Sequence, residues 1–201
     1  FNTDDVLSDG LGTTPLIQNN TNQSVIADTF NGVDCAYWNG YCTLPPDGNY
    51  SSPGGDGCYL YSNGVLISGT ATFDFWVKWE GENDYGTLDQ AIVYERANSW
   101  GFTQLQFSIP DDRLWFTQGN SDNYFVDIIP SLGDNLWHHV LVSKTNNFVS
   151  IYFDGENVAT SETSSGGSAN YTYFGAKRHR SAVWNGWMHK FRIWNNVEFT
   201  F

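Results

Sequence analysis

Basic residues are scarce in this 201-residue sequence, in which 9 Lys and Arg stand against 22 Asp and Glu for a formal net charge of −13. Proteins that bind duplex nucleic acid or an anionic membrane surface gain much of their affinity from Lys and Arg. Both classes are therefore disfavoured. The sequence also lacks any apolar run near the ~18 residues that a transmembrane helix requires, so we expect no membrane insertion.

Charged residues of either sign are few, at 15%, whereas aromatic residues reach 17% and glycine occurs 20 times. Aromatic, β-branched, Gly and Asn residues all have low helix propensity, so few segments favour a helix. The aromatic content is too high for a disordered chain, which cannot bury enough apolar surface to fold. The composition predicts a β-rich protein, and the length suits one sandwich domain.

The sequence has only three cysteines, Cys35, Cys42 and Cys58, all in one stretch rich in Gly, Pro and Asn. Without a suitably spaced His they form an incomplete zinc ligand set. We expect one disulfide and one leftover thiol. Three pairings are open, of which we favour Cys42–Cys58, whose loop closure contributes roughly 3 kcal/mol. The alternative is three reduced cysteines in a cytosolic loop.

Four Asn-x-Ser/Thr sequons are candidate glycosylation sites, at Asn19, Asn22, Asn49 and Asn170. Three of them fall in segments that we predict to be loops, where a glycan can be accommodated. Together with the cysteines they favour a secreted or cell-surface location.

Turn residues and apolar patterns divide the chain into an irregular N-terminal arm, residues 1–24, and one domain, residues 25–201, with a Cys-containing loop insertion at about 33–64. From residue 65 onward, short alternating runs are separated by turn signals, which is typical of an antiparallel sandwich. The alternation is clearest at 71–79, where Phe73, Phe75 and Val77 share one face. The predicted strands are 71–79, 91–95, 102–107, 114–117, 124–129, 137–143, 149–153, 171–174 and 187–194.

Two further strand signals lie in the C-terminal half. Asp154-Gly155 predicts a two-residue type I′ hairpin, since that turn requires positive φ at both positions. The adjacent His138 and His139 lie on a predicted strand, so their side chains point to opposite faces and cannot bind one metal together.

Five motifs follow one another over roughly residues 25–196. They begin with Phe30-Asn31-Gly32, with Thr72-Phe73, with Leu136-Trp137-His138-His139 and its partner Val149-Ser150-Ile151-Tyr152, with Tyr173-Phe174-Gly175 and with Asn185-Gly186-Trp187. In order and spacing these motifs resemble those of laminin-G-like, concanavalin A-like jelly rolls. The resemblance implies an all-β, antiparallel two-sheet jelly-roll sandwich, here with long irregular N-terminal loops. It also implies a structural role for the His138-His139 pair, with one imidazole buried and hydrogen-bonded.

The resemblance raises calcium as a cofactor, because some members of the family bind it near the first and last strands. Asp28, or Asp5 and Asp9 in the N-terminal arm, could supply carboxylates. However, no Asp-x-Asp cluster marks a site, and His189-Lys190 replaces the acidic pair that the closing strand of the family usually carries. We therefore assign no metal ligand.

Catalytic signatures are missing from the sequence. A glycoside hydrolase needs two carboxylates that face one cleft, and alternating acidic residues on a strand are absent. The nearest candidate, residues 80–84, contains Gly and Asn and is predicted to be a turn. No Gly-x-Ser-x-Gly, His-Glu-x-x-His or phosphate-binding motif occurs. We predict that the protein is not an enzyme.

Three of the nine tryptophans adjoin Asn or Gly in predicted loops: Trp38, Trp100 and Trp184. An exposed indole on a loop is a suitable platform for a sugar ring or a protein partner. The alternative is that each indole folds back over an end of the sandwich. Trp79, Trp137 and Trp194 are instead predicted to pack in the core or at its rim.

The cations are concentrated near the C-terminus, where Lys177-Arg178-His179-Arg180 are consecutive. Arg178 and Arg180, with Trp184, are our candidates for a loop that docks an acidic glycan, sulfate or an acidic protein surface. The alternative is a solvated loop that balances nearby acids.

These features predict an extracellular, non-catalytic recognition or adhesion module that binds glycan or protein through loop aromatics and a basic loop. The alternative is a structural subunit of an extracellular filament or coat that self-associates through its N-terminal arm and loops. A polysaccharide-cleaving enzyme is a third and less favoured hypothesis.

Overall fold

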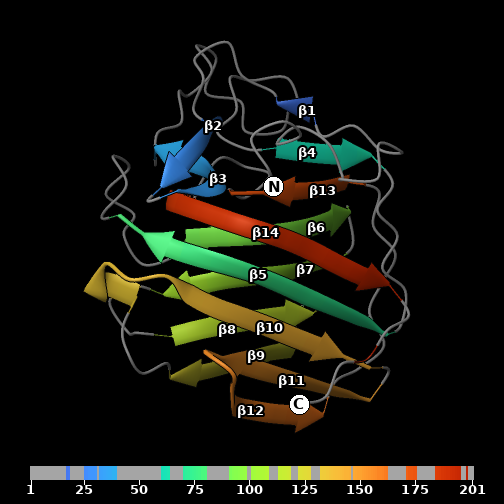
Figure 1. The fold of residues 1–201 in the computed structure, drawn as a ribbon. Helices are drawn as coiled ribbons and strands as arrows, with labels where there is room; N and C mark the ends of the chain where they lie inside the picture. Colours follow the sequence, from blue (N-terminus) through green and yellow to red (C-terminus); the bar gives the residue numbers. More distant parts are fainter. Residues whose placement is uncertain are drawn as a thin grey trace.

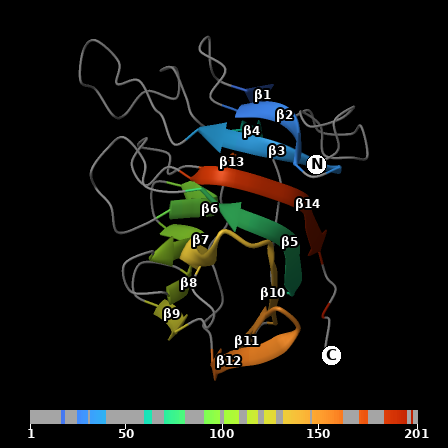
Figure 2. The ribbon, with the colours of Figure 1, turned by 60° about the vertical axis from the view of Figure 1, so that its left-hand side comes forward.

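Two antiparallel sheets of seven strands each pack face to face in the computed structural model, as Figure 1 and Figure 2 show from two directions. The structure describes residues 17–18, 25–30, 32–39, 60–63, 70–80, 91–98, 101–108, 113–118, 122–127, 132–145, 147–162, 171–175, 184–195 and 198. The all-β, antiparallel jelly-roll prediction is confirmed. None of the described residues forms a helix long and apolar enough to cross a membrane.

The sheet nearer the viewer in Figure 1, here the front sheet, has the strand order β12-β11-β10-β5-β14-β3-β2. Its strands are β2 (Val25–Phe30), β3 (Val33–Asn39), β5 (Ala71–Trp79), β10 (His138–Lys144), β11 (Phe148–Phe153), β12 (Glu156–Glu162) and β14 (Asn185–Asn195).

The other sheet, here the back sheet, has the order β1-β4-β13-β6-β7-β8-β9. Its strands are β1 (Ile17–Gln18), β4 (Leu60–Asn63), β6 (Ala91–Asn98), β7 (Gly101–Ser108), β8 (Arg113–Gln118), β9 (Asp122–Asp127) and β13 (Tyr171–Phe174). A short 3₁₀ helix, η1 (Leu132–Asp134), precedes β10.

The core fills the space between the sheets because successive side chains of a strand point to opposite faces. On β5, Phe73, Phe75 and Val77 are fully buried, as the alternation predicts. Phe107 and Phe116 enter the same core from the back sheet, and the rings of Phe73 and Phe116 lie 6.2 Å apart. The sandwich is therefore held together by large apolar side chains that meet between its two layers.

The β11–β12 hairpin confirms the predicted type I′ turn. Asp154 and Gly155 both have positive φ, 51° and 86°, and the turn places Phe153 opposite Glu156. Asp tolerates the left-handed conformation better than most residues, and Gly adopts it without steric cost. The turn thus fixes the register of β12, a strand that no apolar alternation marks.

Two predicted segment boundaries are corrected. The insertion predicted at 33–64 contains β3 and β4, so neither 33–39 nor 60–63 is a loop. The N-terminal arm contributes β1, which pairs with β4. Main-chain pairing explains these differences. β3 is hydrogen-bonded to β2 on one side and β14 on the other, and β4 lies between β1 and β13, which imposes an extended backbone on these segments.

Candidate functional site

Trp184 is not an exposed binding residue, which corrects one of the predicted sites. It is 0% exposed, and its ring lies 5.2 Å from Trp79 of the front sheet and 5.6 Å from Phe107 of the back sheet. Its backbone NH donates a hydrogen bond of 2.7 Å to the carbonyl of Gly175. The indole folds back into the core, which was the alternative reading of its loop-like neighbours.

Trp38 lies in β3 rather than in a loop, opposite Val25 and Gly186. The other predicted binding, disulfide and glycosylation residues lie outside the described residues: Trp100, Arg178, Arg180, Cys42, Cys58, Asn19, Asn22, Asn49 and Asn170. The proposed roles of these nine residues therefore stay predictions. Cys35 is among the described residues and is fully buried.

The calcium hypothesis gains no ligand set. Asp28 belongs to β2, and Asp5 and Asp9 lie outside the described residues. Within the described part of the chain, no group of three or more His, Cys, Asp and Glu side chains is arranged to hold a metal ion.

The structure draws attention to a different surface, the face of the front sheet that points away from the core. On β5, alternation places Asp74 and Trp76 on this outer face, opposite to Phe73 and Phe75. The strand register then sets His139 of β10 beside Trp76, and Arg192 of β14 beside Asp74. Residues that are far apart in the sequence thereby become neighbours on three adjacent strands.

Asp74 links these neighbours through both of its carboxylate oxygens. Oδ1 lies 2.9 Å from Nε2 of His139, and Oδ2 accepts a hydrogen bond of 2.5 Å from Nη2 of Arg192. The His139 ring lies 4.9 Å from the Trp76 ring, and the Arg192 guanidinium lies 5.9 Å from the Trp194 ring. We call these five residues the Trp76–Trp194 row.

The two ends of the row and its arginine are open to solvent. Trp76 is 37% exposed, Trp194 is 40% exposed and the Arg192 side chain is 48% exposed. Large aromatic side chains usually bury their surface, so two half-exposed indoles on one sheet face suit a binding surface. Trp79 packs in the core as predicted, whereas Trp194, predicted to pack in the core or at its rim, is exposed on the outer face.

Asp74 stays ionised because its partners outweigh its burial. Burial raises the pKa of Asp74, but the hydrogen bond from His139 and the positive charge of Arg192 together hold that pKa below its ordinary value. The carboxylate therefore keeps both planar partners in place at neutral pH.

A second aromatic group lies beside the row, nearer to β3. Tyr37 and Trp187 have ring centroids 4.9 Å apart, and the Lys78 ammonium lies 5.9 Å from the Trp187 ring. The Tyr37 hydroxyl donates to Glu80 at 2.5 Å. On the β10–β11 side, Leu141 and Tyr152 are buried. The exposed indoles and the arginine of the row thus lie on β5 and β14.

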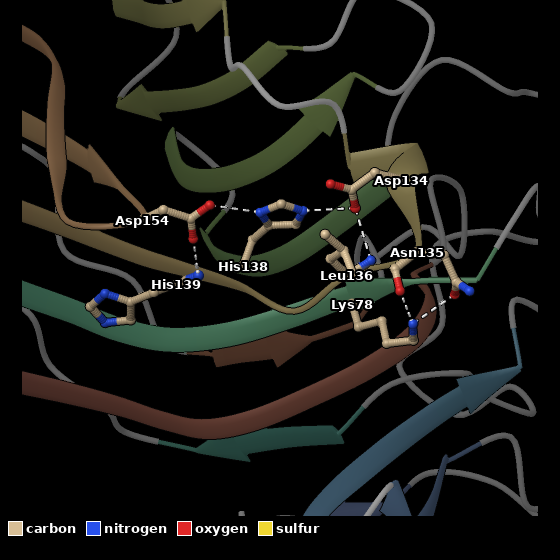
Figure 3. A network of polar contacts seen from close by, with 7 residues as sticks. All are labelled: Lys78, Asp134, Asn135, Leu136, His138, His139 and Asp154. Atoms are coloured by element: carbon tan, nitrogen blue, oxygen red, sulfur yellow. Dashed lines mark hydrogen bonds and ion pairs between the residues drawn. The ribbon is translucent and has the colours of Figure 1, made fainter.

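Figure 3 shows a separate polar network around His138, which is only 2% exposed. Its Nδ1 lies 2.8 Å from Oδ2 of Asp154, and its Nε2 lies 3.0 Å from Oδ1 of Asp134. The other Asp154 oxygen accepts a hydrogen bond of 2.8 Å from the His139 backbone NH. The ring also stacks on Phe153 at 4.9 Å. The prediction that one imidazole of the histidine pair is buried and hydrogen-bonded is confirmed for His138.

This network ties η1, β10 and the β11–β12 hairpin together. Asp134 also accepts a hydrogen bond from the Leu136 backbone NH at 2.8 Å, and Lys78 donates to the side-chain oxygen of Asn135 at 2.6 Å and to its carbonyl. Burial raises the pKa of Asp134, but the hydrogen bonds from His138 and Leu136 outweigh this effect and lower it overall. The network therefore stabilises the fold rather than presenting a reactive group.

Comparison with known families gives one match: residues 52–198 fit the model of a family described as the concanavalin A-like lectin/glucanases superfamily. A comparison with curated proteins gives no match.

Solved structures share the fold at low sequence identity. Domain 4 of AbnA, a GH43 extracellular arabinanase from Geobacillus stearothermophilus in complex with arabinotriose, has a TM-score of 0.64 and 15% identity over 98% of this chain and 89% of that chain. The binding domain of Paraclostridial Mosquitocidal Protein 1 has a TM-score of 0.67 and 13% identity, over 94% and 45% of the two chains.

Domains LG4-5 of the mouse laminin alpha1 chain have a TM-score of 0.54 and 16% identity over 67% of this chain. The chain spans 38% of that laminin structure and less than half of the mosquitocidal binding domain. At these identities the similarity establishes the fold alone.

Proposed function

Because the chain belongs to the concanavalin A-like lectin/glucanases superfamily, we propose that it is an extracellular, non-catalytic module that recognises glycan through the outer face of its front sheet. The observation that carries this proposal is the Trp76–Trp194 row. Exposed indoles offer flat apolar surfaces on which the C–H faces of a sugar ring can stack, and the polar groups between them can bind hydroxyls.

Two of the similar structures support a recognition role. The arabinanase domain was solved in complex with arabinotriose, and the mosquitocidal protein segment is described as a binding domain. The arabinanase is also described as extracellular, which agrees with the location that we infer from the cysteines and sequons of this chain. A protein ligand is the alternative partner.

Three of the described carboxylates favour binding over catalysis. Asp74, Asp134 and Asp154 each hold a histidine, and Asp74 also holds Arg192. A glycosidase needs one carboxylic acid with a raised pKa opposite a second carboxylate. Asp74 and Asp134 instead have lowered pKa values. Because the superfamily description includes glucanases, an activity assay belongs to the test.

The loops add a second region to the proposal. Trp100, Arg178 and Arg180 remain candidates for contacts to a ligand that extends beyond the sheet. The hypothesis of a self-associating structural subunit also remains a prediction.

A glycan array tests the proposed function. We expect the wild-type protein to bind at least one oligosaccharide on an array that includes arabinotriose, and to release no reducing ends from the glycans that it binds. An Arg178→Ala/Arg180→Ala variant separates the loop from the sheet face, because sheet-face binding survives it. The proposal is contradicted if the protein binds no glycan on the array or cleaves a glycan that it binds.

A further inference from the structure

The two indoles of the row stand too far apart to contact one sugar ring. Trp194 lies opposite Thr72 on the neighbouring strand, and Thr72 precedes Trp76 by four residues on β5. At about 3.3 Å per residue and about 4.8 Å between strands, the two positions are roughly 14 Å apart. A ligand that stacks on both indoles must therefore be a chain of several sugar residues.

The groups between the indoles are held in fixed positions. Asp74 binds His139 with one oxygen and Arg192 with the other, and each of these partners lies against one of the exposed tryptophans. A single carboxylate thus orients both ends of the row. Groups that are already ordered lose less conformational entropy when they bind a ligand.

The row carries little net charge. The Arg192 charge is compensated by Asp74 at 2.5 Å, and the chain as a whole has a formal charge of −13. Lys190 is also exposed on β14, but it adds only one positive charge to this acidic protein. A polyanion gains little from such a surface, whereas a neutral glycan offers hydroxyls to Arg192 and C–H faces to the indoles.

We propose that Trp76 and Trp194 are the two ends of one site for a neutral, linear glycan of about three or more sugar residues, and that Asp74 is its positioning residue. The inference rests on the proposed function and adds the ligand's charge, shape and minimum length. It also assigns a binding role to Trp76, Asp74, His139 and Arg192, which the sequence pattern alone did not indicate.

Calorimetric titration with neutral gluco-, xylo-, manno- and galacto-oligosaccharides of one to six residues tests the inference. We expect the wild-type affinity for at least one series to rise tenfold or more between the disaccharide and the tetrasaccharide, and to change less than twofold between low and high salt. Trp76→Ala and Trp194→Ala each remove this gain with chain length. Phe148→Ala, a matched loss of an exposed aromatic residue from β11, keeps it.

Asp74→Asn tests the positioning role. We expect this variant to keep the wild-type affinity for the disaccharide within about threefold but to bind the tetrasaccharide no more tightly than the disaccharide. A general loss of stability does not alter the ratio of these two affinities. Its folding is checked by its thermal unfolding curve.

The outcomes separate the two proposals. A protein that binds no glycan on the array overturns the proposed function and the inference together. Binding to charged glycans alone, equal affinity for short and long chains, or full length dependence in both tryptophan variants overturns the inference alone. Full length dependence in Asp74→Asn overturns the positioning role.

Discussion

At the scale of single residues, Gly186 shows how tightly the centre of the front sheet is built. It has φ of 141° and lies between Trp38 of β3 and Trp79 of β5. A Cβ at this position would stand 2.1 Å from the Lys78 carbonyl oxygen, which is backbone and cannot move aside easily. Gly186 therefore permits β14 to begin against β5.

Gly186→Ala should destabilise the protein by about 3 kcal/mol, because it combines an unfavourable φ with a backbone clash. Chemical denaturation followed by tryptophan fluorescence measures the loss. Gly155→Ala is the matched control: its φ is 86°, but no atom lies within 4 Å of the added Cβ. We expect about 1 kcal/mol for the control, and equal losses in the two variants would refute the steric explanation.

Trp76 and Trp184 show at the same scale that residue type does not decide role. Both are tryptophans, yet one is 37% exposed on the outer face and the other is fully buried. The alternation of β5 predicts that Trp76 faces away from Phe73 and Phe75. No comparable pattern surrounds Trp184, whose neighbours Asn185 and Gly186 are typical of a turn.

At the scale of elements, β10 begins with two histidines that serve the two sides of the front sheet. His138 joins η1 to the β11–β12 hairpin through Asp134 and Asp154, while His139 contributes to the Trp76–Trp194 row through Asp74. The His138 network and the Trp76–Trp194 row thus meet at neighbouring residues of one strand. Sequence analysis could predict the opposite orientations, because a strand alternates its side chains, but not the carboxylate partners, which come from other elements.

These carboxylates should make the protein sensitive to acid. The pKa of Asp134 is lower in the folded protein than in the unfolded chain, so its contribution to stability is complete above the unfolded pKa and is lost as the pH falls through the folded pKa. Asp74 follows the same sign. We expect the melting temperature to fall as the pH drops below about 4.

Asp134→Asn should reduce this dependence, since an amide cannot be protonated in that range. We expect its melting temperature at pH 7 to be roughly 2–4 °C lower than that of the wild type, with a smaller decrease on acidification. Calorimetry at several pH values measures both. The control is Glu156→Gln, an exposed residue at the start of β12. If the melting temperature of Asp134→Asn depends on pH as steeply as that of the wild type, the Asp134 carboxylate does not contribute to the acid sensitivity.

At the scale of the whole molecule, Trp184 holds the two layers together. It contacts Trp79 of the front sheet and Phe107 of the back sheet and is among the largest fully buried side chains of the described residues. Its Nε1 has no hydrogen-bond acceptor among the described residues, so the indole is kept for its size and shape.

Trp184→Ala should cost about 3–5 kcal/mol of folding free energy because it leaves a cavity between the sheets. Trp184→Phe should cost clearly less, since it keeps a ring and removes an unsatisfied NH. Trp76→Ala, at a residue that is 37% exposed, should cost clearly less than Trp184→Ala, because it leaves no cavity between the sheets. Urea denaturation compares the three, and a small loss in Trp184→Ala would contradict the inter-sheet role.

The sequence by itself determined the class of the protein. Alternating apolar residues and the Asp154-Gly155 turn are local patterns that predict strands and a hairpin, and the order of the motifs predicted an antiparallel sandwich. Only the tertiary structure decided where Trp184 packs, that residues 33–39 form a strand, and that Asp74, His139 and Arg192 meet. The physical reason is that strand register and burial depend on pairing between segments as far apart as β5 and β14, about which no local pattern carries information.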